Sequence, residues 1–112
     1  MHLLNCLTNA SGFEESKNIL QGKNLFVKSF NKKGIYLVRY NKDKCDMTDP
    51  DVMKCRGLVM RQEDNRVLCY PPQKSISIQS FLENVEQNWN KVECEEFLDG
   101  TMINIFNHEN EW

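Results

Sequence analysis

The chain has 112 residues, of which 40% are hydrophobic and 27% charged, and these proportions are ordinary for one globular domain. With 14 Lys and Arg against 16 Asp and Glu the net charge is −2, which argues against a broadly basic nucleic-acid-coating protein but leaves room for a local basic patch. No apolar run approaches the ~20 residues of a membrane helix, and the first residues are uncharged and too few for a secretory signal, so we expect no membrane partner.

The first predicted element is a helix over residues 11–22. Ser11 is placed as its N-cap, Glu14 follows three residues later, and Gly22 stops the helix. The helix is short and half amphipathic.

Two β-hairpins are predicted next, over residues 24–40 and 55–70. In each, two runs of β-branched and aromatic residues flank a link that carries turn residues. The charged stretch 41–54 between them reads as a loop with one helical turn. Pro71-Pro72 ends the second hairpin, because proline cannot donate to a ladder.

The last third of the chain is predicted to hold a helix over residues 79–88 and a third hairpin, with strands at 92–97 and 101–106 around Asp99-Gly100 and a turn at 107–110. The whole sequence thus predicts an α+β fold of antiparallel hairpins with two short helices.

The cysteine pattern is the odd set of positions 6, 45, 55, 69 and 94, with no C-x-x-C pair. It predicts reduced thiols in a cytoplasmic, reducing compartment, with neither a disulfide framework nor a metal site.

Three short patterns have the residue types of phosphate chemistry. In Arg56-Gly57, glycine lets the backbone come close while the guanidinium fork reaches a phosphate. In Pro71-Pro72-Gln73-Lys74, two prolines fix the trajectory of a lysine point charge. The third pattern is Asp99-Gly100, between the last two predicted strands.

Each pattern also has a simpler interpretation. Taken alone, Arg56 is a surface arginine at a strand start, Lys74 a solvated loop charge, and Asp99-Gly100 a hairpin turn. Glu95 and Glu96 alternate faces on a strand, so paired-carboxylate catalysis is not supported.

In their order and spacing, the three patterns resemble the N-terminal part of the RNA ligase family typified by the bacteriophage T4 enzyme, within the covalent nucleotidyltransferases. The resemblance covers about residues 24–112, as a partial ligase-like domain, and leaves residues 1–23 as an N-terminal helical segment.

The resemblance implies an α+β fold like the first part of a nucleotidyltransferase domain, and RNA end joining with ATP and Mg²⁺ through a lysyl-adenylate. It implies that Arg56, Gly57 and Lys74 contact phosphate or nucleotide, and that Asp99 and Gly100 belong to the nucleophile motif. The residues by themselves indicate no cofactor.

The nucleophile position of that motif, two residues before Asp99, is Phe97. A phenyl ring has no lone pair for the phosphoramidate intermediate, and the nearest lysine, Lys91, lies six residues earlier. The later motifs of the family lie beyond the end of this chain, so we expect a nucleotide pocket with one wall missing and weak ATP binding or none.

The sequence therefore favours a degenerate, non-catalytic ligase-like module with a binding or structural role, whose open sheet edge pairs with a partner protein and which can also bind RNA. The first alternative is the N-terminal fragment of an active ATP-dependent RNA ligase. The second is an unrelated small α+β interaction domain. A viral source, and with it a location in the virion, would fit the ligase interpretation.

Overall fold

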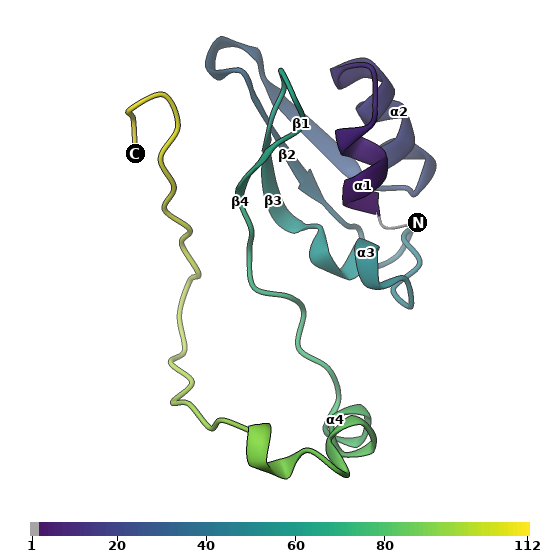
Figure 1. Ribbon diagram of the computed structural model, residues 1–112, viewed down its shortest axis with the longest axis vertical. Coiled ribbons are helices and arrows are strands. Elements are labelled where there is room, and N and C mark those ends of the chain that lie inside the picture. Colours follow the sequence, from purple (N-terminus) through teal and green to yellow (C-terminus); the bar gives the residue numbers. More distant parts are fainter. Residues whose placement is uncertain (1–2) are drawn as a thin grey trace.

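Four antiparallel strands in the order β1-β2-β3-β4 form the single sheet of the computed structural model, which describes residues 3–112 (Figure 1). Helices are interspersed with the strands, so the predicted α+β class is confirmed. In chain order the elements are α1 (Leu3–Thr8), α2 (Phe13–Gly22), β1 (Phe26–Phe30), η1 (Asn31–Lys33), β2 (Ile35–Arg39), α3 (Pro50–Lys54), β3 (Arg56–Arg61), β4 (Val67–Cys69), α4 (Ile78–Val85) and η2 (Trp89–Lys91).

Both early hairpins are confirmed. β1 pairs with β2 in an unbroken register from Phe26↔Arg39 to Phe30↔Ile35, and β3 pairs with β4. The first connection is the 3-10 turn η1, which Gly34 closes in the left-handed conformation at φ 62°. This conformation is nearly free of cost for glycine, which is why the Asn/Gly link marks the turn in the sequence.

The N-terminal segment differs in detail from the prediction. α2 begins at Phe13 with Gly12 at its N-cap. Ser11 instead donates from its backbone N–H and its hydroxyl to the same carboxylate oxygen of Glu15, at 2.6 and 2.7 Å. The carboxylate that accepts hydrogen bonds from Ser11 is thus that of Glu15 and not that of Glu14. The predicted helix is therefore present, but the predicted cap is wrong by one position.

One face of the sheet is buried under α1 and α2. Tyr36, Val38, Leu58 and Met60 are fully buried there, against a group of leucines from the segment before β1: Leu3, Leu7, Leu20 and Leu25. The core thus draws on residues from both sides of the predicted boundary at residue 23.

A buried polar chain ties these layers together. The Tyr36 hydroxyl donates to Asn65 Oδ1 at 2.9 Å, and Asn65 Nδ2 donates to the carbonyl of Leu7 at 2.9 Å. Burial raises the pKa of the Tyr36 phenol, so this hydroxyl remains a proton donor. Asn65 also holds the left-handed φ of 56° in the β3–β4 turn, a conformation that asparagine tolerates better than most residues.

α4 is confirmed with shifted ends, because it starts at Ile78 rather than at residue 79 and ends at Val85 rather than at residue 88. Its N-cap is Ser77, whose hydroxyl accepts from the backbone N–H of Ser80 at 3.1 Å. No helix among residues 3–112 is long and apolar enough to cross a bilayer.

The predicted third hairpin is wrong. Residues 92–107 run extended and join no strand ladder among residues 3–112; we call residues 92–112 the arm and residues 3–70 the body (Figure 1). A hairpin by itself is marginal in water and needs a surface that buries one of its faces. The predicted hairpin turn at Asp99-Gly100 does not form: of these two residues only Gly100 has a positive φ, whereas a type I′ hairpin turn needs one at both.

The predicted turn near the end of the chain is present. Glu109 and Asn110 both have left-handed φ values, and His108 and Glu111 form a two-residue antiparallel bridge around them. This end of the arm touches the body at Lys33, which forms an ion pair with Glu111 and whose carbonyl lies 3.1 Å from His108 Nε2.

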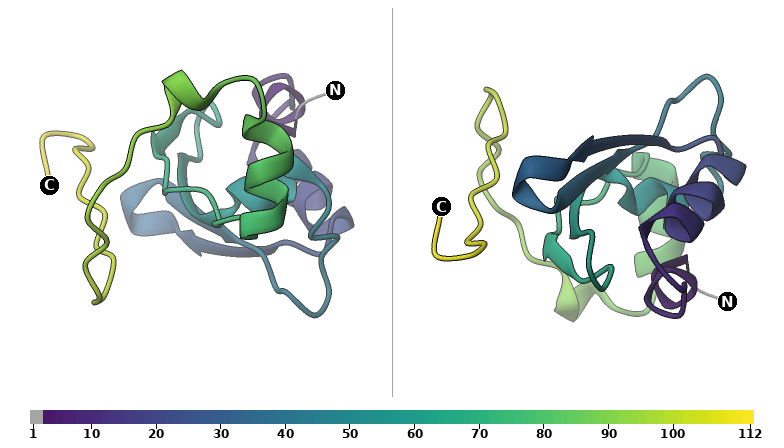
Figure 2. Two further views of the ribbon diagram at one scale, coloured as in Figure 1. Left: turned by 90° about the horizontal axis from the view of Figure 1, so that it is seen from below. Right: turned by 90° about the horizontal axis from the view of Figure 1, so that it is seen from above.

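The arm makes the molecule elongated. Its radius of gyration is 16.1 Å, against about 13 Å for a compact chain of this length, and its longest dimension is 45 Å. In both views of Figure 2 the arm stands beside the sheet, on the side away from α1 and α2.

Candidate functional site

Arg56 reaches its position through a β-bulge at Gly57. Val38 pairs with Leu58 but Arg39 pairs with Arg56, so Gly57 is the extra residue of β3. Its φ of 112° is a conformation that side chains rarely adopt. Alternation counted back from Leu58 would put Arg56 on the core face, but the bulge places it opposite Arg39 on the open face of the sheet.

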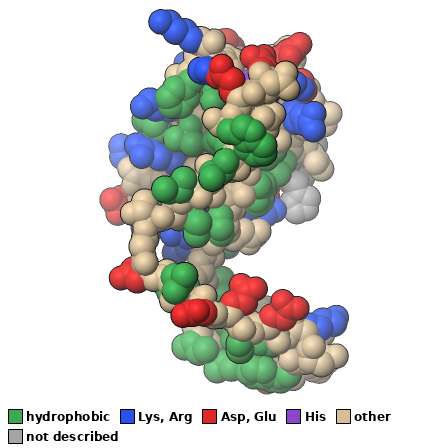
Figure 3. Space-filling view, turned by 90° about the vertical axis from the view of Figure 1, so that its left-hand side faces the viewer, with side chains coloured by type: hydrophobic (Ala, Val, Ile, Leu, Met, Phe, Trp, Pro, Cys, Tyr) green, Lys and Arg blue, Asp and Glu red, His purple; other side chains and the backbone are tan. Residues whose placement is uncertain are grey.

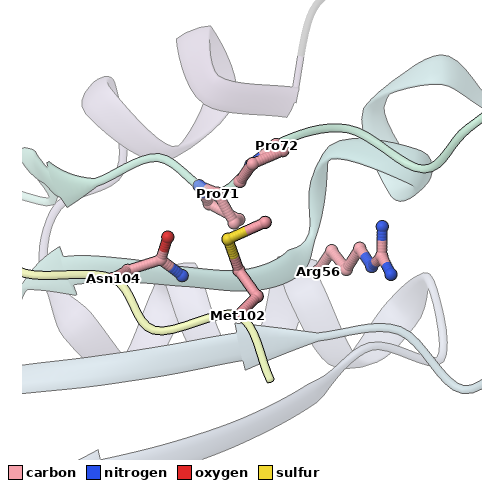
Figure 4. A pocket seen from close by; sticks show the side chains of 5 residues that line it. All are labelled: Arg56, Pro71, Pro72, Met102 and Asn104. Atoms are coloured by element: carbon pink, nitrogen blue, oxygen red, sulfur yellow. The ribbon is translucent and has the colours of Figure 1, made fainter. Parts of the chain in front are cut away.

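The Arg56 side chain lines a small cleft together with Pro71, Pro72, Met102 and Asn104 (Figure 4). The two prolines follow β4, and Met102 and Asn104 come from the arm. The cavity measures about 140 Å³. It is smaller than the roughly 300–1,000 Å³ of ordinary ligand pockets, so it suits one phosphate group rather than a nucleotide.

The charge of Arg56 is uncompensated in the described part of the chain. No carboxylate among residues 3–112 forms an ion pair with its exposed guanidinium. A guanidinium presents several donors in one plane, which matches two oxygens of a phosphate. In Figure 4 the guanidinium lies at the edge of the cleft and points away from Pro71 and Met102, so it offers an anion a two-pronged donor next to the cleft.

Cys55, next to Arg56, contributes no nucleophile. Its side chain is buried, and its Sγ lies 3.4 Å from the carbonyl of Asp51. Burial, with the nearby Asp51 carboxylate as a further cause, raises the pKa of the thiol to about 12. The thiol is thus neutral at physiological pH and unreactive as a nucleophile. None of the five cysteines, all of which lie in the described part of the chain, forms a disulfide.

The other predicted site residues are not gathered around Arg56. Lys74 is half-buried in the segment between β4 and α4, and the cleft is lined without it. Asp99 and Gly100 are exposed on the arm, and the Phe97 side chain is 94% exposed. The structure thus joins the first pattern to the prolines of the second but leaves the third apart.

The residues present do not fit ATP and Mg²⁺, which the resemblance implies. Among residues 3–112 there is no group of three or more Asp, Glu, His or Cys side chains that could hold a metal ion. The Arg56 cleft is too small for a nucleotide, and the strands at 92–106, which were expected to help build the nucleotide pocket, do not form.

Sequence reasoning missed two parts of this site. Gly57 carried a signal, since an isolated glycine within a strand pattern often marks a bulge. For Met102 and Asn104 the sequence signal was weaker, namely their alternation with Ile103 and Ile105. In Figure 4 both side chains point toward β3 and the prolines.

Comparisons with protein-family models, with curated proteins and with solved structures found no match to this chain. The likeness to RNA ligases therefore rests on the sequence patterns alone.

Proposed function

We propose that this chain is a non-catalytic, RNA-ligase-like module that binds the phosphorylated end of an RNA. The observation that carries the proposal is the bulge at Gly57, which turns Arg56 out of the core and places it at the edge of the cleft beside Pro71 and Pro72. Glycine takes this backbone conformation without strain. The guanidinium that it leaves exposed and unpaired beside the cleft has the charge and the planar donors that bind a phosphate.

The absence of catalysis follows from the chemistry of the arm. Phe97 stands where a ligase would carry its lysine, and the ring is almost fully exposed rather than inside a pocket. Lys91 belongs to η2, six residues away in sequence, and could not replace it without a change of register. Nothing on the arm between Phe97 and Asp99 can form a bond to phosphorus through nitrogen.

The test of inactivity is a denaturing gel after incubation with labelled ATP and Mg²⁺. We expect no label on the protein. A covalently labelled band would contradict the proposal and support the alternative of an active ATP-dependent RNA ligase.

The test of end binding compares two oligoribonucleotides of one sequence, with a 5′-phosphate and with a 5′-hydroxyl. The wild type should bind the phosphorylated strand several-fold more tightly, as expected for one charge-assisted contact. Arg56→Ala should abolish this preference, whereas Arg66→Ala, which removes an exposed arginine outside the cleft, should retain it. Equal binding of both strands by the wild type would refute the proposed role of Arg56.

Binding of a partner protein would explain why the arm is extended and exposes hydrophobic side chains. Its backbone is extended and outside any ladder among residues 3–112, and Ile103 and Ile105 are 77% and 76% exposed. Figure 3, which views the molecule from the arm side, shows hydrophobic side chains down this face. Such a strand can complete the sheet of another chain. Native mass spectrometry of the protein from its source tests this: a stable complex with a second protein supports the partner, and a monomer alone contradicts it.

A further inference from the structure

The open face of the sheet is basic although the chain as a whole is acidic. The four strands contain four cations, Lys28, Arg39, Arg56 and Arg61, and no Asp or Glu, whereas the chain carries a net charge of −2. Within residues 3–112, Arg61 is the one of these four cations that forms an ion pair, with Asp64. This face thus has the charge complementarity that a polyanion needs.

Aromatic rings accompany two of these cations. Phe26 and Phe30 share the open face of the edge strand β1 and are 44% and 41% exposed. The guanidinium carbon of Arg39 lies 4.5 Å from the centre of the Phe26 ring, and the Lys28 ammonium lies 5.2 Å from that of Phe30. Aromatic rings and guanidinium planes are the surfaces on which unpaired bases stack.

The Phe26–Arg39 pair lines a second and larger hollow, which we call the notch. It measures about 370 Å³, within the range of ordinary ligand sites, and its lining residues are Phe26, Arg39, Tyr40, Asn41 and Lys42. The Phe26 ring offers a stacking surface, since Tyr40 packs against the core, and two cations can meet phosphates. Asn41 Oδ1 accepts from the backbone N–H of Asp43 at 2.9 Å, which leaves its Nδ2 to donate to the edge of a base. No carboxylate lines the notch.

The notch and the Arg56 cleft are neighbours. Arg39 and Arg56 are register partners across β2 and β3, so their Cα atoms lie roughly 5 Å apart. An RNA whose terminal phosphate binds Arg56 therefore has a stacking surface within reach of its next nucleotides.

We infer that the notch is a subsite for single-stranded RNA, in which a base stacks on the Phe26–Arg39 pair while Lys42 meets the backbone. This rests on the proposed function, because the RNA end at Arg56 gives the strand its starting point. Double-stranded RNA would not fit, since its bases are stacked on each other and cannot reach the rings.

The experiment measures binding of two 3′-labelled decauridylates, one with a 5′-phosphate and one with a 5′-hydroxyl, by fluorescence anisotropy. Phe26→Ala and Arg39→Ala should each lower the affinity for both strands about tenfold and leave their ratio unchanged, since base stacking is indifferent to the end group. Arg39→Lys keeps the charge but loses the planar surface, and should also weaken binding. Lys32→Ala removes an exposed charge at the opposite end of the hairpin and serves as the matched control.

The outcomes separate the two proposals. A 5′-phosphate preference together with unchanged affinity in Phe26→Ala and Arg39→Ala would overturn the notch alone. Binding of both strands alike, lost in Phe26→Ala, would overturn end recognition by Arg56 and support the notch. Equal competition by an RNA duplex or by poly-glutamate would show attraction by charge only and overturn the notch. Thermal unfolding of each variant verifies that it folds.

Discussion

The body and the arm both contain alternating hydrophobic residues, but these residues are buried in the body and exposed in the arm. In the body, Tyr36, Val38 and Leu58 alternate on strands and are completely buried beneath α1 and α2. In the arm, Ile103 and Ile105 alternate in the same way, and yet three-quarters of each side chain meets solvent. The comparison teaches that strand-forming residues acquire a ladder only where a surface covers one of their faces, because β-propensity is largely a measure of packing context.

The largest contrast should appear in thiol reactivity. Cys94, exposed near the start of the arm, should react with a maleimide as an accessible thiol does. Buried Cys55 should react more than about 100-fold more slowly, because it becomes accessible only when the body opens. Peptide mapping by mass spectrometry identifies the labelled sites, and Cys94→Ser should remove the fast phase. Equal rates at the two cysteines would mean that the body is not closed.

Core truncation tests the same contrast thermodynamically. Leu58→Ala should lower the free energy of unfolding by about 3 kcal/mol, because it leaves a cavity in a fully buried layer. Ile103→Ala in the arm should change it by less than about 0.5 kcal/mol. Urea denaturation measures both. A comparable loss in the two variants would place the arm within the cooperative unit.

The next prediction concerns the buried hydrogen-bonded chain of the body, in which Asn65 links Tyr36 to Leu7. Asn65→Ala removes the acceptor of Tyr36 and the donor to Leu7, and should cost about 2 kcal/mol in urea denaturation. Tyr36→Phe should cost about 1 kcal/mol, because it strands only the Asn65 oxygen. Asn65→Gly relieves the left-handed backbone and isolates the hydrogen-bond part; full stability in that variant would assign the whole effect to the backbone.

The smallest expected effect concerns the β3–β4 turn. The hydrogen-bonded ion pair with Arg61 lowers the pKa of Asp64 from 3.8 to about 2. A carboxyl with a depressed pKa in the folded state stabilises above its unfolded pKa, and the effect is lost as the pH falls through the folded value. Asp64→Asn should lower the melting temperature by about 2 °C at pH 7, and the difference should fade between pH 4 and pH 2. A difference that persists below pH 2 would point to another cause.

The parts of the fold that the sequence predicted are those with local causes. The first hairpin could be recognised because Gly34 supplies the turn and the flanking runs alternate. α1 could not, because six residues with two buried leucines are too few for a helical period to stand out. The strands at 92–106 were predicted from composition, but composition does not reveal whether another part of the chain covers them.

The candidate site was predicted in part for a similar reason. Arg56 and the prolines were singled out as residue types, and the structure brings them to one cleft. Lys74 was expected to join them, but the segment after Pro72 takes it elsewhere. The side of the sheet on which Arg56 lies depends on the bulge, and only the register shows that.

Gly57 has a consequence for how β3 tolerates changes in length. Gly57 interrupts the alternation of buried and outward side chains along β3. Buried Cys55 and outward Arg56 precede it, and buried Leu58 and outward Val59 follow, so Gly57 is one residue more than the alternation needs. Removing Gly57 would join two halves that already alternate correctly. Removing Leu58 instead would also restore the alternation, but it would put Gly57 in the buried position of Leu58 and leave a cavity there. A lineage could thus shed this glycine without losing the sheet.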